Sequence, residues 1–135
     1  MKQPKLQHNQ NRQKGNYYET VAAEYLMRQG LTILAQNFSC RQGEIDLICQ
    51  QPANQQQISL SKFPVLVFVE VKYRQYQKFG GAIATISAAK QRKLRHTAQY
   101  YMNQHGINEN YTPCRFDVIA IEGSVDNIQW LTNAF

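Results

Sequence analysis

The sequence is poor in the features that zinc proteins, secreted proteins and membrane proteins depend on. Its three cysteines, Cys40, Cys49 and Cys114, are far apart, no C-x-x-C pair occurs and its three histidines are scattered, which argues against a zinc site. Unpaired thiols suit a reducing compartment. No apolar run approaches the roughly 18 residues of a membrane helix, and the N-terminus lacks the apolar segment of a secretory signal. We therefore expect a cytoplasmic protein without a membrane partner.

Phosphate-binding glycine loops are also missing, and what remains is a basic chain of ordinary size. Neither G-x-x-x-x-G-K nor G-x-G-x-x-G occurs, which argues against phosphate-loop nucleotide chemistry. The 135 residues suffice for one domain with a single core. Fifteen Lys and Arg against nine Asp and Glu give a net charge of +6. This balance favours an anionic partner, but a solvated basic surface explains it equally well.

Hydrophobic patterning divides the chain into a tail and one domain. Residues 1–14 contain almost nothing to bury, so we expect a disordered basic tail followed by a single domain over residues 15–135. Periodicity and turn residues predict helices at 17–30 and 84–106, strands at 31–40, 43–50, 65–74 and 115–123, a long hairpin connection at 51–64, and a short fifth strand or a tail at 127–135. The order α-β-β-β-α-β indicates an α/β domain with a mixed central sheet flanked by helices.

The segment VFVEVKYR places a carboxylate and an amine on one face of a strand. Side chains alternate across a strand, so Glu70 and Lys72 point to one side and the valines to the other. Such a pair is often only a solvated ion pair. Two further acids break the apolar pattern, however: Asp46 inside a strand, and Glu19 on the apolar stripe of the first helix. Taken alone, Asp46 could be a strand-end turn residue and Glu19 the partner of a nearby base.

Together these four residues suit metal-assisted hydrolysis of a phosphodiester. Carboxylate oxygens are ligands that Mg²⁺ prefers, and a metal polarises the phosphoryl group and lowers the pKa of its bound water. A nearby lysine can orient that water or offset the charge that develops in the transition state. Along one strand, Glu70 and Lys72 lie roughly 6.6 Å apart on the same face, so the carboxylate can hold the metal while the amine reaches the water.

Five segments resemble the YraN-like family of bacterial proteins, in the order found in that family. They are GNYYETVAAEYLMRQGLTILAQN, GEIDLI, VFVEVKYR, FGGAIATISAAKQRKL and RFDVIAI, and they cover nearly the whole chain beyond the tail. That family resembles the PD-(D/E)xK nuclease superfamily, and its fold is similar to that of archaeal Holliday-junction resolvases. The resemblance therefore implies a restriction-endonuclease-like core and nuclease machinery.

The resemblance also implies a role for each residue of the acidic set. Asp46 takes the aspartate of the motif, Glu70 the second acid, Lys72 the lysine and Glu19 the helix-borne acid, and these four would be catalytic. The metal ligands would be Asp46, Glu70, Glu19 and the backbone carbonyl of Val71, holding Mg²⁺ with Mn²⁺ as a substitute. Ile45 stands where the motif's proline would precede Asp46. Because junction resolvases act as dimers, a homodimer is also expected.

Basic residues near the proposed site are candidates for contacts with nucleic acid. They are Arg41, Arg74, Lys90, Arg92 and Arg95. Arg74 follows Lys72 on the same face, and Lys90, one turn before Leu94, could reach inward from the edge of the second helix's apolar stripe. The alternative is that the helix only needs a solvated polar face, for which lysine and arginine are good helix formers. Asp117, amid apolar residues, is expected to pair with Arg115 or a helix lysine.

Two functions stay open at this point. The first is a Mg²⁺-dependent endonuclease that hydrolyses phosphodiester bonds in nucleic acid, more readily DNA than RNA, with branched or junction DNA as the substrate. The alternative is a non-catalytic nucleic-acid-binding or adaptor module on a nuclease fold, in which the acidic residues are a remnant. No element that reads bases is visible in the sequence.

Overall fold

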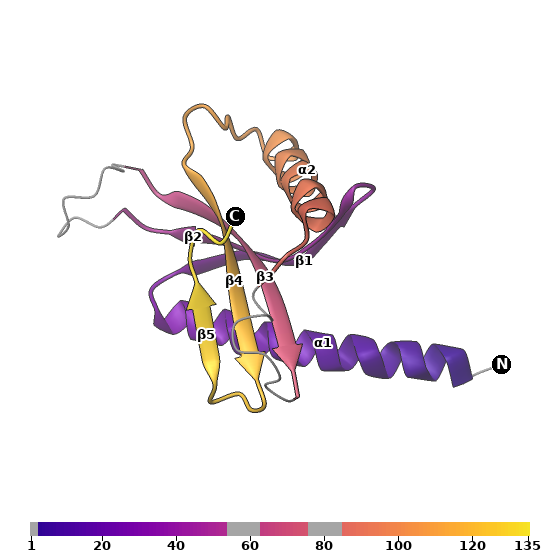
Figure 1. Ribbon diagram of the computed structural model, residues 1–135. Coiled ribbons are helices and arrows are strands. Elements are labelled where there is room, and N and C mark those ends of the chain that lie inside the picture. Colours follow the sequence, from indigo (N-terminus) through magenta and orange to yellow (C-terminus); the bar gives the residue numbers. More distant parts are fainter. Residues whose placement is uncertain (1–2, 54–62, 76–84) are drawn as a thin grey trace.

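A computed structural model describes the backbone of residues 3–53, 63–75 and 85–135, and the side chains from residue 16 onward within those ranges. Within these ranges the chain forms one mixed sheet and two helices, and Figure 1 shows their arrangement. The elements are α1 (Gln3–Arg28), β1 (Thr32–Cys40), β2 (Gly43–Gln51), β3 (Val65–Arg74), α2 (Ala88–Gln104), β4 (Cys114–Glu122) and β5 (Ile128–Leu131). The predicted α/β class, mixed sheet and α-β-β-β-α-β order are confirmed, and the chain ends with a short fifth strand.

The five strands lie side by side in sequence order, with one parallel pair at the centre. β1 pairs with β2, β2 with β3 and β4 with β5, all antiparallel, whereas β3 and β4 run parallel from Leu66↔Cys114 to Arg74↔Glu122. Parallel neighbours need a crossover connection, and α2 lies in the connection between them. The segment with Glu70 and Lys72 is therefore part of a central strand, as its apolar composition suggested.

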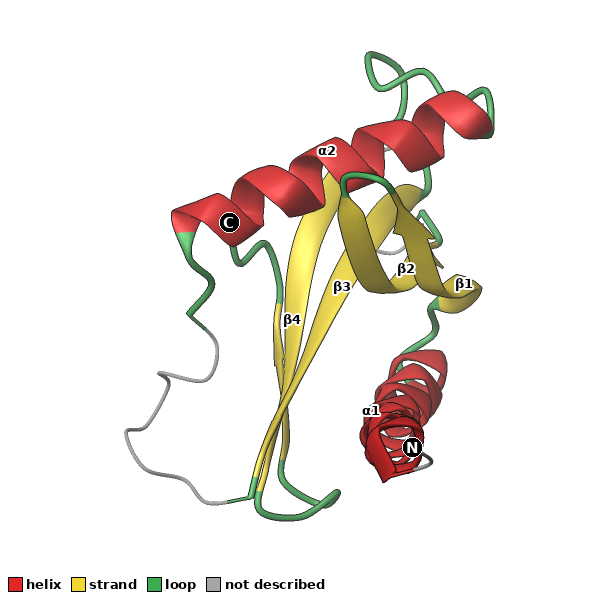
Figure 2. Cartoon of the chain, turned by 90° about the vertical axis from the view of Figure 1, so that its right-hand side faces the viewer, coloured by secondary structure: helices red, strands yellow, loops and turns green. Residues whose placement is uncertain are grey.

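The two helices cover opposite faces of the sheet (Figure 2). α1 contributes Ala22, Ala23 and Leu26, spaced as one helical stripe, to a core with alternate residues of the strands. α2 packs on the other face, and Ser87 caps its first turn by accepting a hydrogen bond from the Lys90 amide. The α2 core consists of Ile45, Ile48, Leu66, Phe68, Ile86, Leu94, Ala98, Tyr101, Met102 and Val118.

α1 begins at Gln3, well before the start that the hydrophobic pattern favoured. The structure therefore has helical backbone over residues for which the sequence indicated disorder. Lysine, arginine and glutamine have high helix propensity, so a helix that is anchored by tertiary packing can extend through them at little cost. The division into a tail at 1–14 and a domain at 15–135 stays a prediction. Most of the predicted hairpin connection at 51–64 lies outside the described residues.

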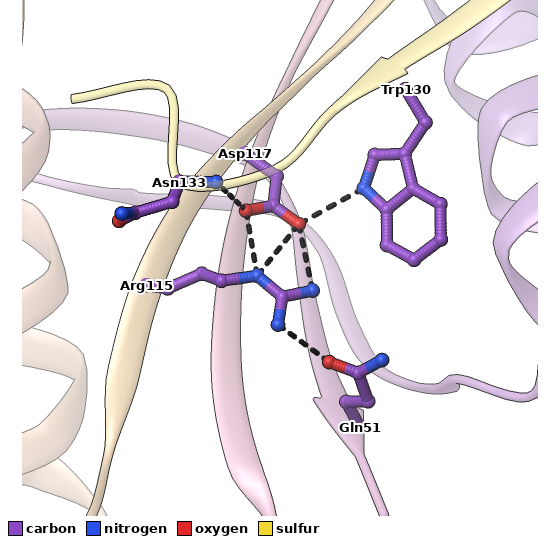
Figure 3. A network of polar contacts seen from close by, with 5 residues as sticks. All are labelled: Gln51, Arg115, Asp117, Trp130 and Asn133. Atoms are coloured by element: carbon purple, nitrogen blue, oxygen red, sulfur yellow. Dashed lines mark hydrogen bonds and ion pairs between the residues drawn. The ribbon is translucent and has the colours of Figure 1, made fainter. Parts of the chain in front are cut away.

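A buried carboxylate fixes β5 and the C-terminal residues to the sheet (Figure 3). The Asp117 side chain is fully buried and accepts hydrogen bonds from the Arg115 guanidinium, the Trp130 indole N–H and the Asn133 amide at 2.9–3.1 Å. Arg115 also donates to Gln51 Oε1 at 2.5 Å. The predicted pairing of Asp117 with Arg115 is confirmed. Because its oxygens are occupied by these partners, Asp117 belongs to the framework of the fold.

Across the described part of the chain, neither helix is both long and apolar enough to cross a membrane.

Candidate active site

The sheet opens between β2 and β3, and Asp46 lies at that opening. The two strands pair from Gln51↔Val65 to Leu47↔Val69; continued regularly, this register would place Ile45 opposite Val71. Instead the Val71 amide donates to Asp46 Oδ2 at 2.8 Å. A side-chain oxygen thus takes the place of a backbone acceptor. Ile45 packs in the α2 core and Leu47 in the α1 core, so the direction of β2 changes at Asp46.

Glu19 reaches the same opening from the opposite side of the sheet. It lies one turn before Ala22 and Ala23, which fix α1 against the strands. Burial raises the pKa of its carboxyl group, and the neighbouring Asp46 and Asn37 side chains oppose that rise. Among the described residues, Glu19 Oε2 is buried without a hydrogen-bond partner. The Glu19 charge also raises the pKa of Asp46, so this pair of acids favours a proton or a cation beside it.

Glu70 completes the acidic set and pairs with a cation from α2. It is 8% exposed, and Lys90 Nζ donates to Glu70 Oε1 at 2.5 Å. Lys90 lies in the first turn of α2, so the helix start directs it toward β3 while about half of its side chain remains exposed. The sequence indicated that Lys90 could reach inward, and this contact is how it does so.

The protein raises the pKa of every carboxyl group in this set. Burial raises the pKa of Asp46 to about 6, and the Glu19 charge adds to the effect against the opposing hydrogen bond from Val71. Burial raises the pKa of Glu70 to about 7, and the Asp46 charge adds to it. Lys90 opposes the shift at Glu70, but burial outweighs this ion pair. Without a further cation, these three carboxyl groups therefore bind protons more readily than exposed acids do.

Lys72 lies beside the acidic set, but a different group holds its amine. Its Nζ donates to the Thr85 carbonyl at 2.7 Å, in the residues that lead into α2. Burial lowers the pKa of Lys72, and the Lys90 charge lowers it further, while Glu70 acts in the opposite direction. A lysine with a lowered pKa can exchange a proton more readily than an exposed one. The structure thus places two lysines at the site, Lys90 in contact with Glu70 and Lys72 alongside.

The donor atoms suit a hard divalent cation, although the side chains do not enclose one as they stand. Carboxylate oxygens are the ligands that Mg²⁺ prefers, and Glu19 Oε2 is buried with no partner in the part of the chain that the structure describes. A strand residue directs its amide and carbonyl to the same lateral side, so the Val71 carbonyl lies on the Asp46 side. No group of three His, Cys, Asp or Glu in the described residues surrounds a common point, because Asp46 binds an amide and Glu70 binds Lys90.

The predicted nucleic-acid contacts are dispersed over three parts of the surface. Arg74 is exposed near the end of β3, Arg41 lies in the turn between β1 and β2, and Arg92 is exposed on α2. Arg95 is turned toward the C-terminal residues, with its guanidinium 5.1 Å from the Phe116 ring centre and 5.5 Å from that of Phe135. Arg95 therefore lies apart from the acidic set, whereas Lys90 is within it.

Two neighbours of the site did not emerge from the sequence. Asn37, in β1, lies beside Glu19, where its side chain opposes the rise in the pKa of that acid, and it has a left-handed backbone with φ 53°. Asparagine tolerates this conformation better than most residues. Tyr18 stacks on Tyr73 with ring centres 3.7 Å apart. This contact joins α1 to β3 next to Glu19 and Lys72. In the sequence, Tyr18 precedes Glu19 and Tyr73 follows Lys72. That adjacency to predicted site residues was the only indication that the two tyrosines lie near the site.

Fold and site together define an α/β protein in which two helices and two strands bring three acids and two lysines to one opening in the sheet. The chain belongs to uncharacterised protein family UPF0102, whose model matches residues 18–121. It is 48% identical to a UPF0102 protein of Colwellia psychrerythraea over 90% of this chain and 88% of that protein. It is also 42% identical to one of Methylobacillus flagellatus, over 92% and 97% of the two chains. The YraN-like resemblance is thereby confirmed, and Glu19, Asp46, Glu70, Lys72 and Lys90 all lie within the matched residues.

Proposed function

We propose that this chain is a metal-dependent endonuclease that hydrolyses phosphodiester bonds in nucleic acid, with branched or junction DNA as its substrate. The observation that carries the proposal is the convergence of Glu19, Asp46 and Glu70 from α1, β2 and β3 on one opening, where two lysines also lie. Buried acids with raised pKa values are characteristic of functional sites. If these acids only stabilised the fold, the buried Glu19 Oε2, which has no hydrogen-bond partner among the described residues, would be unexplained.

The residues of the site have separate roles in this proposal. Glu19, Asp46, Glu70 and the Val71 carbonyl would hold Mg²⁺, or Mn²⁺ in its place. When bound, the metal supplies Lewis acidity toward the phosphoryl group and lowers the pKa of a water molecule. Lys72, whose own pKa is lowered, orients the attacking water and accepts its proton. Lys90 leaves Glu70 and offsets the negative charge that grows on the phosphoryl oxygens.

The position of the site within the fold suits a phosphate backbone as the ligand. Arg74, at the exposed end of β3, follows Lys72 by two residues on the same face, so a phosphate that approaches the lysines also approaches this guanidinium. A net charge of +6 strengthens the attraction of a polyanion. A homodimer would allow two strands of a junction to be cut, and we include it in the proposal. The free thiols of Cys40, Cys49 and Cys114 accord with action in the cytoplasm.

A second candidate is a nucleic-acid-binding or adaptor module without catalysis. The observation in its favour is the Lys90–Glu70 contact, because a lysine already satisfies the charge of the most buried carboxylate of the set. In that case the acids and Lys90 would stabilise the fold, and binding would rest on the exposed basic residues. Binding that ignores divalent metal and survives Asp46→Ala would support this candidate.

A cleavage panel tests the proposal. Purified protein is incubated with branched, linear duplex and single-stranded DNA and with RNA, each in Mg²⁺, in Mn²⁺ and in EDTA. Metal-dependent cutting with a preference for branched DNA is expected. Absence of cutting in every combination would contradict the proposed activity.

A further inference from the structure

A groove of about 260 Å³, lined by residues that carry polar groups, lies on the exposed side of α2, separate from the acidic set. Gln42, from the turn between β1 and β2, forms one wall. The rest of the lining comes from α2 and consists of His96, Gln99, Tyr100 and Asn103. These four residues recur at spacings of three and four, so they form one stripe along the helix.

The turn that forms one wall of the groove is fixed against the helix. A Cβ atom on Gly43 would lie 3.2 Å from Thr97 Oγ1, so the absence of a side chain at this position allows the turn to approach α2 closely. Next to the turn, the Phe38 ring contacts the Tyr101 and Tyr100 rings, with centres 5.2 and 6.2 Å apart. Because backbone and aromatic packing fix both walls, the fold determines the shape of the groove.

The chemistry of the groove suits an uncharged, planar, hydrogen-bonding ligand. Three carboxamides, Gln42, Gln99 and Asn103, can each donate and accept hydrogen bonds, and Tyr100, 43% exposed, offers a ring face and a hydroxyl. Among the described residues that line the groove, none carries a carboxylate and His96 alone can carry a positive charge. A phosphate would favour more cations than this. A nucleobase, with a ring face and hydrogen-bonding edges, matches the lining better.

Cations flank the groove where the sugar–phosphate backbone of such a ligand would run. Arg41 precedes Gln42 in the turn, and Arg92 lies one helical turn before His96; both are exposed. Gln42 is four residues from Asp46 along β2, a separation of at most roughly 14 Å. At about 3.4 Å per nucleotide of a stacked strand, this corresponds to at most about four nucleotides.

We propose that this groove binds an unpaired nucleobase of nucleic acid, within about four nucleotides of the phosphate at the acidic site. The placement of that phosphate rests on the proposed function; the binding of the base does not. A base inside a duplex is stacked and paired and cannot enter, so the groove selects nucleic acid with a single-stranded segment beside the cleavage point. Branched DNA with unpaired bases at its branch is of this class.

Binding without metal tests the inference independently of cleavage. Single-stranded and duplex oligonucleotides that contain the fluorescent base 2-aminopurine are titrated with the full-length protein in EDTA. Base stacking on an aromatic ring, roughly 1–3 kcal/mol per base, predicts that Tyr100→Ala weakens single-strand affinity by about 5- to 150-fold and abolishes the fluorescence change. Gln99→Ala should weaken single-strand binding by a smaller factor, and duplex affinity should change little for either variant.

Matched variants keep the result interpretable. Gln29→Ala removes an exposed glutamine at the end of α1 and should bind both oligonucleotides like the wild type. Arg92→Ala should weaken both equally, because phosphates are common to both. Tyr100→Phe, which retains the ring and its packing, should keep most of the single-strand affinity. Thermal unfolding verifies that the variants fold.

Three outcomes would overturn the inference: no single-strand binding by the wild type, equal losses on both oligonucleotides for Tyr100→Ala and Gln99→Ala, or no loss for either. If these variants bind normally while Glu70→Ala abolishes cutting, the inference fails and the proposed function stands. If they lose single-strand binding while no nucleic acid is ever cut, the proposed function fails and the groove stands.

Discussion

Lys90 Nζ, on α2, lies 2.5 Å from Glu70 Oε1, on β3, and supplies the cation nearest to the buried acids. Twenty residues separate the two in sequence, and α2 packs on the sheet face to which Glu70 points. A second cation that uses Glu70 as a ligand must compete with this ammonium. Metal and Lys90 are therefore alternative partners of one carboxylate.

The first prediction concerns this competition. Lys90→Met removes both the competing contact and a nearby positive charge, so Mg²⁺ and Mn²⁺ should bind several-fold more tightly to the variant. Isothermal titration at pH 8 measures the affinity. Lys93→Met, an exposed lysine of the same helix, is the matched control and should bind metal like the wild type. Equal affinity in wild type and Lys90→Met would contradict the competition.

The second prediction concerns pH and stability without metal. The folded-state pKa values of Asp46 and Glu70, about 6 and about 7, exceed the values of unfolded acids, so the folded state binds more protons between about pH 4 and 7. The stability contributed by this proton binding is fully present below about pH 4 and is lost as pH rises through the folded values. The pKa differences of the two groups together predict that the free energy of unfolding falls by roughly 5–6 kcal/mol across this window.

Urea unfolding in EDTA at several pH values measures this loss. Glu70→Gln should flatten the curve, because the amide does not titrate, and Mg²⁺ at pH 8 should restore stability to the wild type. An identical slope for wild type and Glu70→Gln would show that Glu70 does not carry the shift.

The third prediction separates stability from metal binding at Glu19. In Glu19→Gln the amide donates a hydrogen bond to the Asp46 carboxylate, so the repulsion between two acids disappears and one metal ligand is lost. Stability in EDTA at pH 8 should rise by about 1 kcal/mol, while Mg²⁺ affinity should fall by about tenfold. Thermal unfolding and titration calorimetry measure the two effects. A variant that is less stable and binds metal normally would place Glu19 in the framework.

The fourth prediction concerns the Asp117 network. Asp117→Ala leaves the Arg115 guanidinium and the Trp130 indole N–H without their acceptor, which should destabilise the protein by about 3–5 kcal/mol. Asp126→Ala, at an exposed position near β5, should change stability by less than about 0.5 kcal/mol. The urea concentrations at the midpoints of unfolding measure both changes in stability, provided that the dependence of the unfolding free energy on urea concentration is the same in all variants. Similar midpoints for the two variants would mean that the network contributes little to the fold.

Much of the fold was predictable because periodicity determines local structure. The valines of β3 and the stripe from Ala22 to Leu26 alternate with the periods of strand and helix, and both elements form as expected. The start of α1 was not predictable in this way, since residues 3–14 have no apolar stripe and their helix depends on propensity and on a packed neighbour. The restriction-endonuclease-like core and the homodimer stay predictions.

At the site, the sequence indicated which charges are out of place but not their partners. Glu19, Asp46 and Glu70 interrupt apolar patterns. A charged residue at a position that the pattern would bury can be recognised from the local sequence and indicates a site. The Lys90–Glu70 contact and the Val71–Asp46 hydrogen bond depend on where α2 lies and where β2 leaves β3. Those are properties of the whole sheet, and no local pattern encodes them. The direction of the Arg95 side chain was unpredictable for the same reason, because two rings that are distant in sequence, Phe116 and Phe135, determine it.

The most direct test of the central claim compares three proteins on branched DNA in Mg²⁺: the wild type, Glu70→Ala, and Glu24→Ala, which removes an exposed acid of α1. All three are verified to be folded by thermal unfolding. The wild type and Glu24→Ala should cut at equal rates, and Glu70→Ala should lose at least about 100-fold, as expected when a group that stabilises transition-state charge is removed. Equal cutting by all three would contradict the claim, as would the absence of cutting by the wild type.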